Sequence, residues 1–115
     1  MATVVDPLLH DRVRTAGRAF GSKAELARYL GVDRSRPGRW ESGQDIPSED
    51  ALRRIQDLDY VLARAQRVWA EPVAREWLRS PNSLLNGTTP LVALKMEGPA
   101  PVIAALDAAS AGSYA

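Results

Sequence analysis

The stretch SKAELARYLGVDRSRPGRW, residues 22–40, contains the start and end of one helix and the start of another. Ser22 and Glu25 form a capping box, in which the serine hydroxyl accepts a hydrogen bond from the Glu25 amide and the glutamate bonds back to the serine amide. A helix is therefore expected to begin at Ser22. It is expected to end at Gly31, because glycine readily adopts the left-handed conformation that closes many helices.

A second short helix is expected to run from about Asp33 or Ser35 to Ser42, where Gly43 stops it. Small and apolar residues fall where two crossing helices and a tight turn need them: Leu26, Ala27, Leu30, Gly31, Val32 and Trp40. This spacing predicts a helix-turn-helix, a motif whose second helix enters the major groove of DNA. The alternative is a helical hairpin whose arginines form a solvated face.

The polar residues of this motif are candidates for contacts with DNA. Arg34 and Arg39 are placed to reach base edges, since arginine can make a bidentate contact to guanine. Lys23 and Arg28 are placed near phosphates. The predicted DNA-binding residues are Lys23, Arg28, Arg34, Ser35, Arg36 and Arg39.

Pro37 and Gly38 stand where a recognition helix usually has a valine or isoleucine that packs into the core. If Asp33 is the cap, Pro37 removes a backbone hydrogen bond just after the first turn. If Ser35 is the cap, the proline lies harmlessly early in the helix. The recognition helix is therefore expected to be short or to start late.

Charge is distributed unevenly along the chain, although the formal net charge is only +1. Residues 1–40 carry eight Lys and Arg against four Asp and Glu, a local excess of +4. Residues 41–60 carry six acids against two arginines, a local excess of −4. The first third is a candidate anion-binding surface, and the acidic segment after it confines that surface to one side.

The remaining periodicity is helical as well. Apolar residues recur at three and four positions from Leu9 to Phe20, and again along a long helix that starts near Ser48. The predicted buried stripe of the long helix is Leu52, Ile55, Leu58, Leu62, Ala65 and Trp69. No alternating apolar and polar run is long enough to indicate a strand. The sequence predicts an all-α fold with a helix-turn-helix domain at 1–47 and a C-terminal domain at 48–115, which includes the long helix.

Prolines divide the segment after the long helix into short pieces. Pro72 is expected to open one helix, Ser80 and Pro81 to be the cap and first residue of the next, and Thr89 and Pro90 to repeat that arrangement. Helices this short are not stable on their own, so each must pack against the long helix or against a partner. One interpretation is a subdomain that only completes the core.

A second interpretation comes from a sequence pattern. The pattern consists of Trp77-Leu78, Ser80-Pro81-Asn82, Leu84-Leu85-Asn86-Gly87 and Thr89-Pro90-Leu91. It resembles the toxin-binding region of the Xre/MbcA/ParS antitoxin family, and the resemblance spans roughly residues 22 to 112. The resemblance implies an N-terminal Xre-like helix-turn-helix and a non-enzymatic antitoxin. It also implies that the partner is a RES-domain toxin, which consumes NAD and whose cofactor cleft the antitoxin covers.

The end of the chain fits such a role on its own chemistry. Most side chains of residues 108–115 are small and would let the backbone approach a partner closely, and Tyr114 supplies a rigid anchor. The alternative is a frayed terminus. The predicted toxin-binding residues are Trp77, Ser80, Pro81, Asn82, Leu84, Leu85, Asn86, Gly87, Pro90 and Leu91, with Ser110, Gly112, Ser113 and Tyr114 in the tail.

Other classes of protein find little support in the sequence. The chain has one histidine, His10, and no cysteine, so neither a catalytic constellation nor a metal or cofactor site is expected. No run reaches the roughly 20 apolar residues of a membrane span. The N-terminus lacks the pattern of a signal peptide, so a cytoplasmic location is expected.

These observations lead to one hypothesis and one alternative. The hypothesis is an antitoxin that binds and neutralises a RES-domain toxin, represses its own operon through the helix-turn-helix, and works as a homodimer or in a larger complex with toxin. The alternative is a plain helix-turn-helix repressor that has no toxin partner. A neighbouring gene for a RES-like protein would separate the two.

Overall fold

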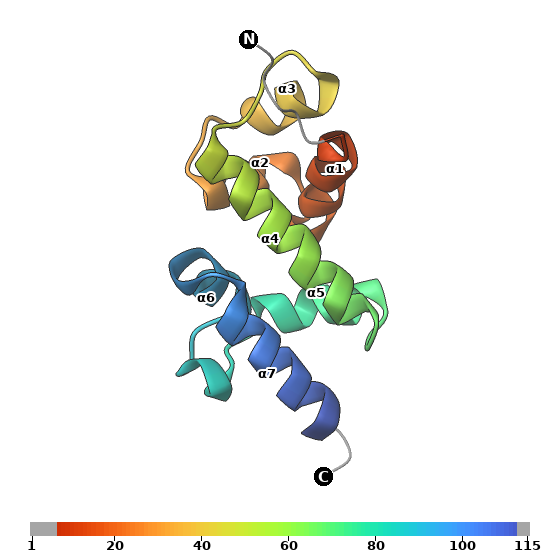
Figure 1. Ribbon diagram of the computed structural model, residues 1–115, viewed down its shortest axis with the longest axis vertical. Coiled ribbons are helices and arrows are strands. Elements are labelled where there is room, and N and C mark those ends of the chain that lie inside the picture. The colour runs from red at the N-terminus through yellow and green to blue at the C-terminus, as the bar shows by residue number, and fades with distance from the viewer. Residues whose placement is uncertain (1–6, 113–115) are drawn as a thin grey trace. The chain divides into compact units, whose positions relative to one another are not determined.

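The computed structural model describes residues 7–112, and every regular element within them is a helix (Figure 1). The elements are α1 (Leu9–Phe20), α2 (Lys23–Leu30), α3 (Arg36–Ser42), α4 (Glu49–Gln66), α5 (Glu71–Arg79), a 3-10 turn η1 (Ser83–Leu85), α6 (Pro90–Glu97) and α7 (Pro99–Gly112). The predicted all-α class is confirmed. None of these helices is both long and apolar enough to cross a membrane.

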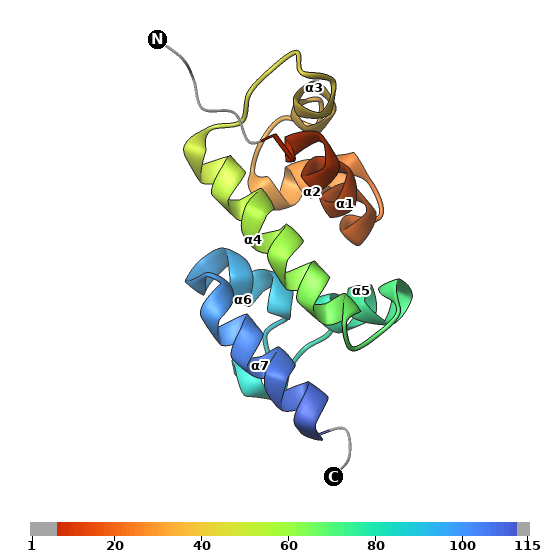
Figure 2. The same ribbon diagram turned by 45° about the vertical axis from the view of Figure 1, so that its right-hand side comes forward.

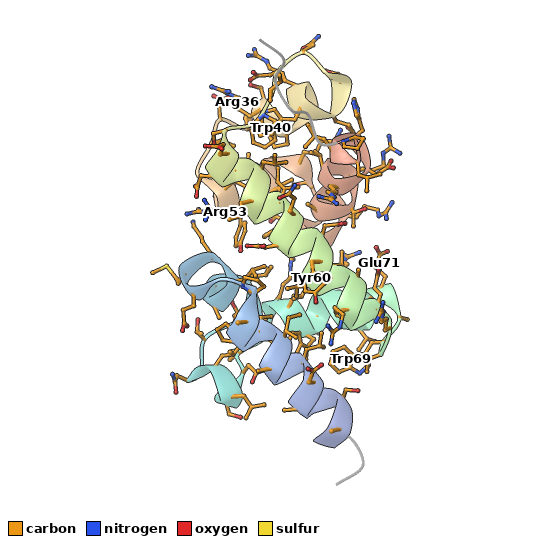
Figure 3. The ribbon with its side chains drawn as sticks, viewed as in Figure 1. Arg36, Trp40, Arg53, Tyr60, Trp69 and Glu71 are labelled. Carbon is orange, nitrogen blue, oxygen red and sulfur yellow. The ribbon has the colours of Figure 1, made fainter. Side chains whose placement is uncertain are left out.

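The chain divides into two compact units, and the boundary falls between Asp59 and Tyr60, inside α4. In the first unit, α1, α2 and α3 contact one another. Trp40, labelled in Figure 3, is 1% exposed and belongs to the core of this unit, together with Val13 of α1 and Leu26 of α2. The helix-turn-helix thus lies in a unit with its own core.

In the second unit, α6 contacts both α5 and α7, and η1 contacts α7 (Figure 2). The core of this unit includes Leu62 from α4, Leu78 from α5, Leu94 from α6 and Val102 from α7, all buried. Short helices are individually unstable in water, so their burial against one another is what keeps them folded.

The long helix is shorter than its apolar periodicity predicted. Ile55, Leu58, Leu62 and Ala65 are fully buried, but α4 ends at Gln66. The prediction that Trp69 extends the buried stripe of this helix is wrong. Trp69, labelled in Figure 3, follows a turn and is half-buried. The centroid of its ring lies 5.7 Å from that of Trp77.

Candidate functional site

Local hydrogen bonds fix the turn of the helix-turn-helix. The Ser22 hydroxyl accepts a hydrogen bond from the Glu25 amide at 3.1 Å, so the predicted cap of α2 is confirmed. At the other end, Gly31 is left-handed with φ of 73°. The next amide, from Val32, donates to the carbonyl of Ala27 at 3.0 Å. A side chain at position 31 would be strained, which explains the glycine there.

The second helix of the motif, α3, starts late, as in the sequence alternative that has Ser35 as the cap. The carboxylate of Asp33 accepts hydrogen bonds from the Ser35 amide at 2.9 Å and from the Ser35 hydroxyl at 2.6 Å. These bonds hold the pKa of Asp33 below its usual value. The helix α3 then begins at Arg36, and Pro37 lies within its first turn, where an amide hydrogen is not needed. Ser35 is therefore engaged in the turn itself.

The predicted DNA-binding cations fall into two groups. Lys23 and Arg36 are paired within the chain, with Glu41 and with Asp45 respectively, the latter pair at 2.7 Å. The guanidinium groups of Arg28, Arg34 and Arg39 are exposed and form no ion pair with any residue from 7 to 112. Only this second group has no ion pair to break when a ligand binds.

Sequence reasoning missed the role of Glu41, a residue of α3 whose side chain is 18% exposed. Its carboxylate accepts hydrogen bonds from Lys23 of α2 and, at 3.2 Å, from Arg14 of α1. These two cations, Lys23 foremost, hold the pKa of Glu41 below its usual value. His10 of α1 donates from Nδ1 to the backbone carbonyl of Glu41. No spacing rule could link residues this far apart in the sequence.

In the second unit, the segment between α5 and α6 is a closed loop. The Asn82 carboxamide oxygen accepts a hydrogen bond from the Leu84 amide at 2.9 Å, and the Gly87 amide donates to the Asn82 carbonyl at 2.9 Å. The Asn82 amide donates to the carbonyl of Thr88 at 3.0 Å, which closes the loop. Asn86 is left-handed, with φ of 60°. The backbone of this loop is thus held by its own hydrogen bonds.

The prediction that Ser80 and Pro81 start a helix is wrong. Ser80 ends α5 in an extended conformation, and its hydroxyl donates to the carbonyl of Glu76 at 2.7 Å. The next cap is Asn82, which precedes η1. The corresponding prediction for α6 is confirmed, because the Thr89 hydroxyl accepts from the Val92 amide at 3.2 Å and Pro90 begins the helix.

Burial separates the predicted toxin-binding residues. Leu85, Pro90 and Leu91 are buried and hold the second unit together. Leu84, in contrast, is 60% exposed on the closed loop. Trp77 is half-buried against Trp69. The exposed and buried members of this predicted set therefore have different structural roles.

Exposed large apolar side chains that sequence reasoning did not single out include two on α6 of this unit. Val92 and Met96 of α6 are 49% and 75% exposed and lie one helical turn apart. The helix is apolar around most of its surface, so the sequence pattern gave no preferred face. The structure was needed to find this pair.

The last helix is tied to α4. Arg64 donates to the Asp107 carboxylate at 3.0 Å and to the Tyr60 hydroxyl at 3.1 Å. Of the predicted tail residues, Ser110 is half-buried and Gly112 is exposed at the end of α7. Ser113 and Tyr114 lie outside the described residues.

Comparison with known proteins shows what the C-terminal part of the chain resembles. A sequence model described as the antitoxin Xre/MbcA/ParS C-terminal toxin-binding domain matches residues 64–112. This segment is thus similar to that domain family. The toxin-binding domain so defined runs from the end of α4 through α7 and contains the closed loop. The resemblance found in the sequence is confirmed.

A similar chain occurs among solved structures, in the crystal structure of the M. tuberculosis MbcT-MbcA toxin-antitoxin complex. The two chains are 26% identical with a TM-score of 0.76, and the match covers 96% of this chain and 100% of that chain. The likeness therefore extends beyond the toxin-binding domain to the helix-turn-helix unit. No curated protein matches the chain.

Proposed function

We propose that the chain is an antitoxin that binds a RES-domain toxin and neutralises it by covering the cleft in which the toxin consumes NAD. The observation that carries the proposal is the toxin-binding domain at residues 64–112. The similar chain in the MbcT-MbcA complex supports a toxin as the partner, because its match covers nearly the whole of this chain. A plain repressor without a toxin would have no use for such a domain.

The surface of the toxin-binding domain suits a protein partner. Leu84 projects from a loop whose backbone is fixed by hydrogen bonds, so little conformational entropy is lost when the side chain is buried by a partner. Val92 and Met96 add exposed apolar area on α6. Large apolar side chains on rigid elements are typical anchors of protein interfaces.

Co-expression with the product of the adjacent reading frame tests this function. The two proteins should purify together, and the complex should consume NAD far more slowly than the toxin alone. A helix-turn-helix repressor without a toxin-binding domain serves as the control and should leave the toxin active. Failure of the two chains to associate would favour the plain repressor.

We further propose that the first unit binds DNA and represses the operon of the chain itself. The specific observation behind this second function is the group of exposed, unpaired guanidinium groups on a capped helix-turn-helix, of which Arg39 lies on the recognition helix α3. A guanidinium that already has a carboxylate partner would lose that partner on binding DNA. Arg39 has no ion pair within residues 7–112 that it would have to break on binding DNA.

A further inference from the structure

A surface depression of about 350 Å³ lies beside the turn of the helix-turn-helix. The residues that line it are Ala24, Ala27, Arg28, Val32 and Arg34. The alanines and the valine give it an apolar floor, and both arginines are exposed. No acidic residue lines it, so the two positive charges are not balanced from within the depression.

The two guanidinium groups have no partner elsewhere either. Neither forms a hydrogen bond or an ion pair with another residue of the described range, 7–112. Like charges beside an apolar floor repel each other more strongly than they would in bulk water. An anion placed between Arg28 and Arg34 relieves this repulsion, so the depression favours an anionic group that both can reach.

The turn that carries Arg34 is fixed in place. Asp33 accepts hydrogen bonds from the amide and the hydroxyl of Ser35, on the other side of Arg34 in the sequence. Arg34 therefore projects from a turn that is already ordered before any ligand binds. The carboxylate of the neighbouring Asp33 is hydrogen-bonded to Ser35, so the Arg34 guanidinium remains available to an external anion.

From this geometry we infer that Arg28 and Arg34 hold one phosphate group of the DNA backbone between them, with the adjoining deoxyribose against the apolar floor. The inference rests on the proposed DNA binding and deepens it. An alanine and valine floor contacts a sugar well but offers no hydrogen-bond partner to a base edge. Arg34 is thereby assigned to the backbone instead of to a base, and Arg39 is left as the arginine that reads sequence.

Binding of the full chain to two duplexes over a series of salt concentrations tests the assignment. One duplex is the promoter region directly upstream of the chain's own reading frame, and the other is a scrambled duplex of equal length and composition. The variants are Arg28→Ala, Arg34→Ala and Arg39→Ala. Arg53→Ala, which removes an exposed charge from α4 outside the depression, is the matched control.

Arg28→Ala and Arg34→Ala should each weaken binding to both duplexes by the same factor, up to about eightfold at roughly 0.1 M salt. Each should also lower the salt slope, by at most about 0.9 because the two arginines share one phosphate. Arg53→Ala should change neither. If Arg34→Ala weakens only promoter binding and keeps the salt slope, Arg34 reads a base and the inference is wrong. It is equally wrong if wild type binds and neither depression variant loses affinity. Wild type that binds neither duplex overturns the DNA-binding proposal instead.

Discussion

The carboxylate of Glu41 joins side chains from α1, α2 and α3 of the first unit. Lys23 and Arg14 neutralise it, and their side chains are 45% and 59% exposed. Ion pairs of this exposure contribute modestly to stability, roughly 0.2–1 kcal/mol each. The cluster therefore acts less as a large source of stability than as a fixed link between the recognition helix and the other two helices.

Glu41→Gln should lower the free energy of unfolding by about 1 kcal/mol at neutral pH. Because the pKa of Glu41 is depressed in the folded chain, its stabilising effect is present above the ordinary glutamate pKa and is lost as the pH falls through the folded value. The difference between variant and wild type should therefore shrink as the pH falls below the ordinary glutamate pKa. Denaturant unfolding at several pH values measures it. A difference that does not vary with pH would mean that the charge of Glu41 is not what stabilises the unit.

Leu84 and Leu85 are neighbours with opposite environments, 60% and 7% exposed. Sequence periodicity cannot tell which of two adjacent leucines is buried in a 3-10 helix of a single turn. What decides their roles is the direction in which the closed loop presents each side chain. That direction depends on hydrogen bonds that Asn82 accepts from the amides of Leu84 and Gly87, which only the folded chain contains.

Leu85→Ala should lower the free energy of unfolding by about 2–3 kcal/mol, because it leaves a cavity in the second unit. Leu84→Ala should leave unfolding within about 0.5 kcal/mol of wild type and weaken toxin binding by about 2 kcal/mol, roughly thirtyfold in Kd. Thermal unfolding and calorimetric titration with toxin measure the two effects. Full toxin affinity in Leu84→Ala would remove Leu84 from the interface.

At the scale of elements, the sequence was most informative where a helix boundary is encoded by a local hydrogen bond. The caps at Ser22 and Thr89 follow from the residues themselves. The prediction of a helix start at Ser80 was wrong because a serine hydroxyl can either cap the helix that follows or bond back to the helix that precedes. Here it donates to the backbone carbonyl of Glu76. Which of these occurs depends on packing, which the local sequence does not contain.

The candidate sites, like the helix boundaries, could be predicted from the sequence only in part. The resemblance located the toxin-binding domain, and the residues predicted to contact DNA are exposed on α2, α3 and the turn between them. The pairing of Lys23 with Glu41 and of Arg36 with Asp45 was not foreseen, since each pair is distant in sequence and formed by folding. Charge counting alone cannot distinguish a cation that is free from one that is already neutralised.

The last helix supports a prediction about the tail. Deleting residues 107–115 removes no side chain that is buried among the described residues, because Val102, Ala105 and Leu106 remain. The chain should stay folded, and the loss of the ion pair between Arg64 and Asp107 should lower the free energy of unfolding by at most about 1 kcal/mol. It should still associate with the toxin through residues 77–94 but no longer block NAD consumption.

Full-length Asp107→Asn is the matched control for this deletion, since it removes the ion pair and keeps the tail. It should inhibit the toxin like wild type. If the deletion variant also inhibits fully, the tail has no part in occlusion, which would then have to come from the closed loop and α6.

At the scale of the whole molecule, a single small helix-turn-helix buries little DNA surface. Useful affinity for an operator calls for two copies that read half-sites about 34 Å apart, or a multiple of that distance. We therefore expect a homodimer, either of the free chain or in the complex with toxin. Light scattering should give the mass of two protomers for the free chain, or a mass for the toxin complex that includes two protomers. A single protomer in both states would contradict the expectation.

The two proposed functions lie in separate units, each with its own core, so they should be separable by mutation. Replacing both Arg34 and Arg39 by alanine changes only exposed side chains of the first unit, and it should abolish repression while leaving protection against the toxin intact. The deletion of residues 107–115 should do the reverse. A reporter driven by the chain's own promoter and the growth of toxin-expressing cells measure the two functions in the same strain. If the double arginine variant fails to protect although it is folded and abundant, toxin binding depends on the first unit, and the toxin-binding domain does not neutralise alone.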